Sequence, residues 1–368
     1  MIPYGHQHIN QKDIAAVIKV LKSDWLTQGP KILEFEKALA NYCGAKYAVI
    51  VSHGTAALHL AYLAAGLKRG DEVITTPNTF VATTNMLLAA GAKPVFADIR
   101  LDTYNIDESK IEKLINKKTK AIIPVDFAGQ PCDLKKILKL AKKYKLLVIE
   151  DASHALGARC QGRKIGSLAD LTVFSFHPVK PITTGEGGAI LTDNKRYYQQ
   201  LILLRNHGIY KDKKGKNVMV DLGYNYRLTD LACALGISQL KRLDSFIKKR
   251  RQIVKWYQAE LKNIKEIILP HEIKGNYSGW HLYVIRTLKS PVRNKLVAYL
   301  KSAGVGANFH YPAVYRQPYY RKLGYRLNLK NEEIYQQSCL TLPCYPDLSK
   351  SEVKYISKTI KDFLIDDY

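Results

Sequence analysis

Short apolar runs and stretches of helical periodicity alternate along much of the chain. The runs at residues 47–51, 121–125 and 146–149 are rich in Val, Ile and Leu, which is typical of strands buried on both faces. Segments such as residues 134–144 instead repeat apolar residues every three or four positions, which is typical of helices that cover a sheet. This alternation predicts an α/β fold in which helices cover a mostly parallel central sheet.

The last third of the chain predicts a second, smaller α+β domain. It contains one predicted strand and two predicted helices, at residues 281–285, 293–303 and 350–360. We therefore predict a large domain over residues 1–240 and a linking helix with the small domain over residues 241–368. One continuous helix is expected to run from Thr229 towards Leu261 and to join the two parts.

The composition is strongly basic, but the other features of a nucleic-acid-binding protein are missing from the sequence. Lys and Arg number 57 against 32 Asp and Glu, which gives a net charge of +25. The lysines are spread along predicted helices, as at residues 135–145 and 241–251, and no helix-turn-helix, zinc or aromatic RNA-binding motif accompanies them. A solvated, lysine-rich surface is the better interpretation, and it would also attract an anionic substrate.

The sequence gives no sign of export or membrane insertion. Its first residues lack an apolar stretch behind a basic one, and no apolar run reaches the length of a membrane span. The six cysteines are scattered without a C-x-x-C pair, which is typical of free thiols in a reducing compartment. We expect a cytoplasmic protein that binds neither a membrane nor a metal ion.

The segment LTVFSFHPVKPITTGEGGA, at residues 171–189, carries the most specific chemistry. It begins as a strand that ends near Ser175. Pro178 and Pro181 then flank Lys180, so neither a helix nor a central strand can continue through the lysine. A surface lysine in a turn is the simplest interpretation. A lysine between an apolar strand and a glycine cluster is also a candidate for Schiff-base formation, because partial burial favours its neutral amine.

The pattern SFHPVKxxTTGEGG in this segment resembles the cofactor-lysine segment of the DegT/DnrJ/EryC1/StrS sugar aminotransferases. Other motifs similar to those of the family follow over nearly the whole chain, among them SHGT at residues 52–55, EDASHALG at residues 150–157 and GYNYR at residues 223–227. The resemblance implies the aspartate-aminotransferase-like fold type I of enzymes that use pyridoxal 5'-phosphate (PLP). It also implies a homodimer with shared active sites.

Turns at the ends of strands supply the residues expected to hold PLP. The turn into a helix at Gly54 and Thr55 is a natural phosphate site, because free backbone N–H groups and the helix dipole point at it. Asp151 ends an apolar strand and could simply cap a turn. With Lys180 one strand later, it fits the carboxylate that holds the pyridinium proton. The resemblance thus implies catalytic roles for Lys180 and Asp151, and it adds cofactor contacts from Phe80, His154, Ser175 and Asn225.

Substrate contacts are implied by the resemblance alone. In relatives the loop corresponding to Asn225 crosses into the neighbouring subunit, and an LTxGP element and a segment near residue 310 lie at the sugar site. On the residues alone, packing explains Trp25 equally well, and a lone His310 is more often structural than catalytic. His53 stands where the family commonly has Asn. The implied substrate-binding residues are Tyr4, Trp25, Leu26, Thr27, His53, Arg227, Phe309, His310, Tyr311 and Pro312.

The resemblance implies a PLP-dependent aminotransferase that aminates a nucleotide-linked 4-keto-6-deoxy sugar with L-glutamate as the donor. Stretches such as DASHALG and Leu342-Pro343-Cys344 look closer to the branch of the family in pseudaminic acid biosynthesis. That likeness implies UDP-2-acetamido-2,6-dideoxy-β-L-arabino-4-hexulose as the acceptor. A UDP-linked D-series ketone and the GDP-linked ketone that leads to perosamine are the alternatives.

Two further classes of function are less consistent with these residues. Sugar 3-dehydratases of the same fold have histidine in place of the cofactor lysine, whereas this chain has Lys180. A non-catalytic PLP-binding regulatory protein would not need Lys180, Asp151 and the glycine-rich turn together.

Overall fold

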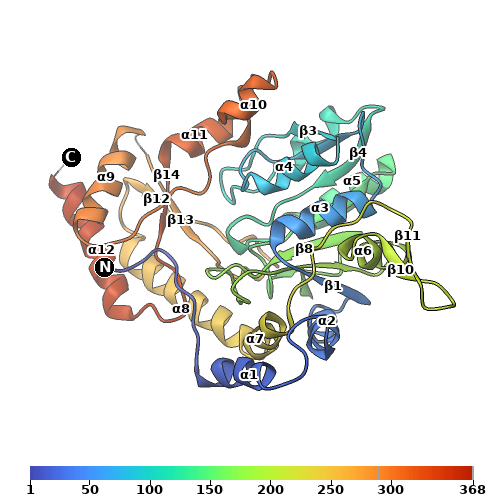
Figure 1. Cartoon of the computed structure of the whole chain (residues 1–368). Helices are drawn as coiled ribbons and strands as arrows, with labels where there is room; N and C mark the ends of the chain where they lie inside the picture. Colours follow the sequence, from blue (N-terminus) through green and yellow to red (C-terminus); the bar gives the residue numbers. More distant parts are fainter. Residues whose placement is uncertain (289, 367–368) are drawn as a thin grey trace.

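The computed structural model describes residues 1–288 and 290–366, and a seven-stranded sheet forms its centre (Figure 1). β9 pairs antiparallel with β1 and β8, whereas the other neighbouring strands are parallel. The predicted α/β fold with a mostly parallel sheet is therefore confirmed. In sheet order the strands are β1 (Tyr47–Val51), β9 (Gly188–Thr192), β8 (Leu171–Ser175), β5 (Leu147–Asp151), β4 (Thr119–Ile123), β2 (Glu72–Thr75) and β3 (Lys93–Phe96).

Helices bury both faces of this sheet, which explains why its strands are continuous apolar runs. On one face the strands pack with α2 (Pro30–Cys43), α5 (Leu134–Tyr144) and α7 (Asp230–Leu240). On the other face they pack with α3 (Gly54–Ala64), α4 (Ala82–Ala89) and α6 (Lys195–Arg205). Neighbouring strand residues alternate between the two cores: Val49 belongs to the second and Ile50 to the first.

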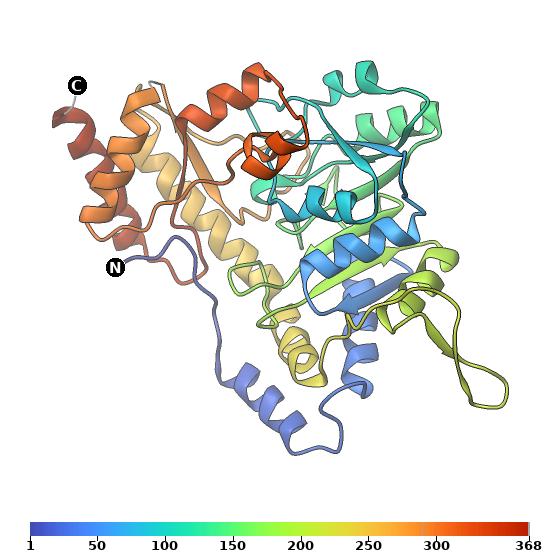
Figure 2. The same cartoon turned by 45° about the horizontal axis from the view of Figure 1, so that its top comes forward.

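The small domain is a three-stranded antiparallel sheet with helices against it. Its strands are β12 (Ile267–Ile268), β13 (Tyr283–Thr287) and β14 (Cys339–Leu342). Its core also takes side chains from α9 (Ser290–Ser302), α12 (Lys350–Asp366) and the C-terminal half of α8 (Leu243–Leu261). The N-terminus joins this domain, because Ile2 pairs with Val305 and packs on the same core. The first residues of the chain thus lie beside its last third (Figures 1 and 2).

The single helix expected from Thr229 towards Leu261 is wrong, because α7 and α8 are separate helices joined at Lys241 and Arg242. Gln239 donates to the buried carboxylate of Asp13 in α1 (Gln11–Leu21) at 2.8 Å, and Arg242 forms an ion pair with the same carboxylate. α7 can therefore stay on the large-domain core while α8 runs into the small domain (Figure 1). Neither Pro nor Gly lies at this bend, and the apolar pattern continues through it. The sequence therefore contains no local signal that the helix ends there.

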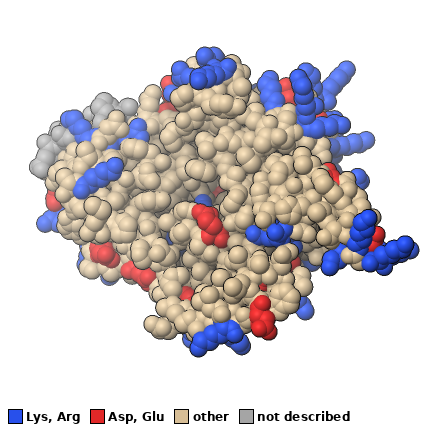
Figure 3. All heavy atoms as spheres, in the orientation of Figure 1, with Lys and Arg blue, Asp and Glu red and all other residues tan. Residues whose placement is uncertain are grey.

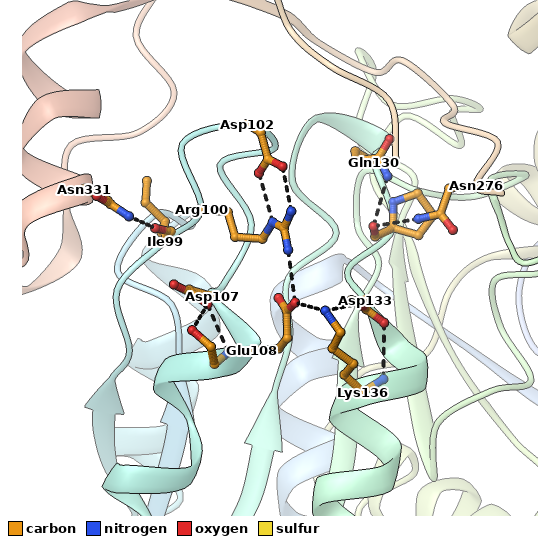
Figure 4. A network of polar contacts seen from close by, with 12 residues as sticks. Ile99, Arg100, Asp102, Asp107, Glu108, Gln130, Asp133, Lys136, Asn276 and Asn331 are labelled. Atoms are coloured by element: carbon orange, nitrogen blue, oxygen red, sulfur yellow. Dashed lines mark hydrogen bonds and ion pairs between the residues drawn. The ribbon is translucent and has the colours of Figure 1, made fainter. Parts of the chain in front are cut away.

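Polar contacts hold the small domain against the loop that follows β3. The carboxylate of Asp98 accepts the backbone N–H groups of Asn331 and Glu332 at 3.0 Å, at the start of α11 (Lys330–Ser338). A carboxylate stabilises a helix N-terminus in this way. The Asn331 side chain also donates to the carbonyl of Ile99, and Arg100 continues the network to Glu108 (Figure 4). These contacts fix the position of the small domain over the ends of the parallel strands.

The shorter elements lie outside the two main sheets. They are the hairpin strands β6 (Arg159–Cys160), β7 (Arg163–Lys164), β10 (Ile209–Lys211) and β11 (Asn217–Met219), the helix α10 (Pro318–Lys322), and the 3₁₀ helices Glu108–Lys110, Glu112–Leu114, Phe127–Gly129 and Val314–Arg316. Basic side chains gather over the large-domain helices and on the projecting β10–β11 hairpin (Figure 3). Within residues 1–288 and 290–366, we find no helix of the length and apolar character that a membrane crossing requires.

Candidate active site

A cavity of about 530 Å³ lies where the C-terminal ends of β5 and β8 face the small domain. Ligands of open α/β sheets bind at this edge. A hollow between the domains is visible near the centre of the face in Figure 3. The lining includes 12 of the residues predicted for the site: Tyr4, His53, Gly54, Thr55, Phe80, Asp151, His154, Ser175, Lys180, Phe309, His310 and Tyr311.

The other predicted residues do not line this cavity, and most of them lie together elsewhere. Thr27 pairs with Thr229, and the carbonyl of Leu26 accepts the backbone N–H of Asp230 at 3.0 Å. Trp25 and Leu26 are 56% and 48% exposed. The stretch 25–27 is therefore brought next to the GYNYR loop, where Asn225 is exposed and Arg227 donates to Asn206. Pro312 is exposed just beyond the lining segment.

Lys180 lies in the tight turn after β8, where its backbone N–H donates to the carbonyl of His177 at 2.9 Å. Its side chain is only partly exposed, at the cavity wall. Burial lowers the pKa of its ammonium to about 7, and the charge of Asp151 opposes this shift. The amine is therefore partly neutral near pH 7, as a nucleophile or a proton carrier must be.

Asp151 is buried, and three donors hold its carboxylate in place. Oδ2 accepts from the hydroxyl of Thr83 at 2.7 Å, and Oδ1 accepts from the hydroxyl and the backbone N–H of Ser153 at 2.6 and 3.2 Å. Thr83 in turn contacts Thr79 at 2.7 Å. We did not predict either threonine. Their spacing of four residues, beside the predicted site residue Phe80, was the sequence signal that the two hydroxyls could lie together at the site.

The N-terminus of α3 forms a close-packed concave site beside Lys180. Nδ1 of His53 caps the helix by accepting the backbone N–H of Ala56 at 2.9 Å, and the first N–H groups of a helix have no partner inside it. A Cβ at Gly54 would lie 2.9 Å from Cβ of Ser175, and one at Gly188 would lie 2.8 Å from the backbone of His53. Only glycine allows these segments to approach so closely, and the result suits a bound phosphate.

Three buried histidines give the opposite wall a polar but neutral character. Burial lowers the pKa of His154, His281 and His310, the last to about 4, and the nearby positive charge of Lys180 adds to the effect. The rings of His154 and His281 lie 4.5 Å apart. Sequence reasoning missed His281, although a histidine at the start of an apolar strand was a usable signal.

These residues together fit PLP. The glycine-bounded start of α3 suits its phosphate, the buried carboxylate of Asp151 suits a protonated ring nitrogen, and the amine of Lys180 suits its carbonyl carbon. Phe80 adds an aromatic wall, with its ring 5.9 Å from that of Tyr311.

Comparison with known proteins decides the family. The model of the DegT/DnrJ/EryC1/StrS aminotransferase family matches residues 7–361. The chain belongs to this family. It is 44% identical over 370 residues to the UDP-4-amino-4,6-dideoxy-N-acetyl-β-L-altrosamine transaminase of Campylobacter jejuni, covering 99% of this chain and 98% of that relative.

Solved structures agree with this assignment. The fold superimposes with a TM-score of 0.95 on Helicobacter pylori PseC, an aminotransferase involved in the biosynthesis of pseudoaminic acid, at 36% identity over 99% of each chain. It also superimposes on the PLP form of Spr1654 from Streptococcus pneumoniae with a TM-score of 0.94, at 32% identity over 99% of each chain. The chain is therefore a PLP-dependent aminotransferase.

The residues of the cavity fit the separate roles that such an aminotransferase needs. Bound PLP supplies a carbonyl carbon that carries the amino group and a ring that withdraws electrons from it. With a pKa of about 7, Nζ of Lys180 can take up and release a proton near neutral pH, which both halves of a transamination require. Asp151 is the buried carboxylate that would hold the proton of the ring nitrogen by its charge.

Proposed function

We propose that this aminotransferase converts UDP-2-acetamido-2,6-dideoxy-β-L-arabino-4-hexulose to its 4-amino sugar with L-glutamate as the donor. The amino group of glutamate replaces the 4-keto oxygen, and glutamate leaves as 2-oxoglutarate. The observation that carries this proposal is the 44% identity, over 99% of the chain, to a transaminase named for that amino sugar. A Helicobacter pylori transaminase of the same name is 37% identical over 99% of the chain.

The chemistry of the cavity supports a sugar as the acceptor. Its wall presents neutral donors and acceptors from Tyr4, Asn308 and Tyr311 and from the three buried histidines. Neutral hydrogen-bonding groups suit hydroxyl and acetamido groups, which carry no charge. The presence of Lys180 also argues against the sugar 3-dehydratase alternative, because those relatives have histidine in place of the cofactor lysine.

We propose further that the active site is completed by a second copy of the chain. Among the residues that the structure describes, no arginine lines the cavity, although a glutamate donor brings two carboxylates that a cation would bind well. Trp25, Leu26 and Asn225 are exposed, and Thr27 pairs with Thr229 just beyond the GYNYR loop. Further exposed apolar side chains occur nearby in the sequence, at Tyr210, Met219, Val220 and Leu222. Such a surface is typical of an interface, and two-fold dimers are the commonest oligomers.

Comparing kcat/KM for epimeric ketones tests the substrate. With glutamate as the donor, we expect the L-arabino 4-ketone to be preferred over the D-xylo 4-ketone and over the GDP-linked ketone by at least about tenfold, since lost hydrogen bonds to buried polar groups are costly. Lys180→Ala is the control and should turn over none of them. A preference for a D-series ketone would contradict the substrate assignment and leave the aminotransferase activity intact.

A further inference from the structure

Tyr311 is held rigidly between the two domains. Its backbone N–H donates to Oδ1 of Asn78 in the large domain at 3.2 Å, and its carbonyl accepts from the side-chain amide of Gln336 in α11. Its phenol oxygen lies 3.2 Å from Nε2 of His154. Three contacts on three different segments therefore fix both the ring and the hydroxyl.

The hydrogen bonds of His154 determine the direction of the Tyr311 proton. Nδ1 of His154 accepts the backbone N–H of Ala128 at 3.2 Å, so this nitrogen carries no hydrogen. The ring is neutral, because burial and the charge of Lys180 lower its pKa far below the usual value. Its single hydrogen must therefore lie on Nε2 and be donated to Tyr311. The phenol oxygen is an acceptor in this bond, and its own O–H points elsewhere.

The free O–H of Tyr311 belongs to a group that lines the cavity. Tyr311 shares this lining with Phe80, Asp151 and Lys180. Two of its ring neighbours, Phe80 and Phe127, have no acceptor in their side chains. Burial, with the nearby Tyr4 and Asp151, raises the pKa of the phenol, so it keeps its proton at neutral pH. Within residues 1–288 and 290–366, we find no side chain that accepts a hydrogen bond from this hydroxyl, so the cavity contains a fixed, protonated donor.

We propose that Tyr311 donates a hydrogen bond to an oxygen of the bound reactants and that His154 is the positioning residue that directs this bond. The oxygen is one that carries negative charge in the ground or transition state, either the ring oxygen of PLP or the C4 oxygen of the keto sugar. The second alternative rests on the proposed function, whereas the first does not. A phenylalanine at position 311 would fill the same space, so the packing would stay while the bond from His154 and the proposed donated bond would both be lost.

Tyr311→Phe, studied in the full-length PLP-loaded protein, separates the alternatives. If the partner is the PLP oxygen, the absorption maximum and its pH titration midpoint shift, and the half-reactions with glutamate and with ketone both slow. If the partner is the sugar oxygen, the spectrum and the glutamate half-reaction stay unchanged, and the ketone half-reaction falls by at least about tenfold. Unchanged spectra and unchanged half-reactions in a folded variant would overturn the proposal.

Variants at His154 test its positioning role. His154→Leu removes the donor to Tyr311 and should reproduce the defect of Tyr311→Phe, whereas His154→Gln keeps one donor and one acceptor and should restore most of the activity. The double variant Tyr311→Phe/His154→Leu should be no worse than either single variant, since both act through one bond. Additive defects would overturn the link between the two residues. The ketone is whichever one the wild-type protein accepts, so an incorrect sugar assignment does not affect this comparison.

Discussion

Burial of the Lys180 side chain lowers the stability of the folded protein. The same burial supplies the neutral amine that the reaction requires. Its pKa falls from 10.5 to about 7 on folding, so the folded state binds fewer protons than the unfolded state between these values. Stability therefore increases as the pH rises from about 7 to 10.5, and the full cost is present below pH 7. A group that destabilises the fold in this way is common in active sites.

Lys180→Met should stabilise the PLP-free protein at pH 7, because a methionine can be buried without losing a charge. We expect the free energy of unfolding to rise by on the order of 1–4 kcal/mol at pH 7, with a smaller gain near pH 10. Urea unfolding of both proteins at equal concentration measures this difference. The exposed Lys139 provides the control, since Lys139→Met changes a side chain that already lies in solvent and should leave the free energy of unfolding near the wild-type value. A gain that grows with pH would contradict the assigned pKa shift.

At the residue scale, the sequence reveals groups that the local backbone marks, but not those that depend on distant packing. Prolines, glycines and strand ends mark Lys180 and Asp151, and both line the cavity. The bond from Thr83 to Asp151 joins residues 68 positions apart, and the contact between Tyr311 and His154 spans 157 positions. No local pattern encodes such pairs, so the direction of the Tyr311 proton could be inferred only from the structure.

At the scale of elements, the close contact of β9 with the start of α3 shapes the predicted phosphate site. The glycine cluster at residues 185–188 indicated a close approach, but it did not identify the partner segment. That partner is the backbone of His53 and Gly54, which a Cβ at Gly188 would meet at 2.8–2.9 Å. The bend between α7 and α8 was missed for the opposite reason, since tertiary contacts of Asp13 form it without a local signal.

Gly188→Ala should therefore displace the start of α3 and weaken PLP binding. Because backbone atoms cannot move away easily, we expect a loss of about 1–3 kcal/mol in unfolding free energy and a rise of at least about tenfold in the Kd for PLP. Urea unfolding and a PLP titration measure the two effects. In the control Gly279→Ala, the nearest atoms would be 3.9 Å from the new Cβ, so both quantities should stay near the wild-type values. Equal PLP affinity in the two variants would argue against this role for Gly188.

At the scale of the whole molecule, the alternation of runs and helices was enough to predict the α/β architecture, because sheet and helix periodicities are local properties. The sequence could not reveal whether a site residue acts in its own subunit. Trp25, Leu26, Thr27, Asn225 and Arg227 were predicted at the site, yet they do not line the cavity of their own chain. A shared site in a dimer would account for all five at once.

Mixing two inactive variants tests this shared site. Lys180→Ala removes the lysine of its own cavity, and Asn225→Ala removes a residue that we assign to the partner's cavity. In a hybrid dimer, one site then has both residues intact, so random subunit exchange should restore about a quarter of the wild-type activity per subunit. The matched control mixes Lys180→Ala with Asp151→Ala. These two residues line one cavity of a single chain, so no hybrid of that pair contains an intact site. If exchange is verified and the Asn225→Ala mixture is as inactive as the control, Asn225 does not act across the interface.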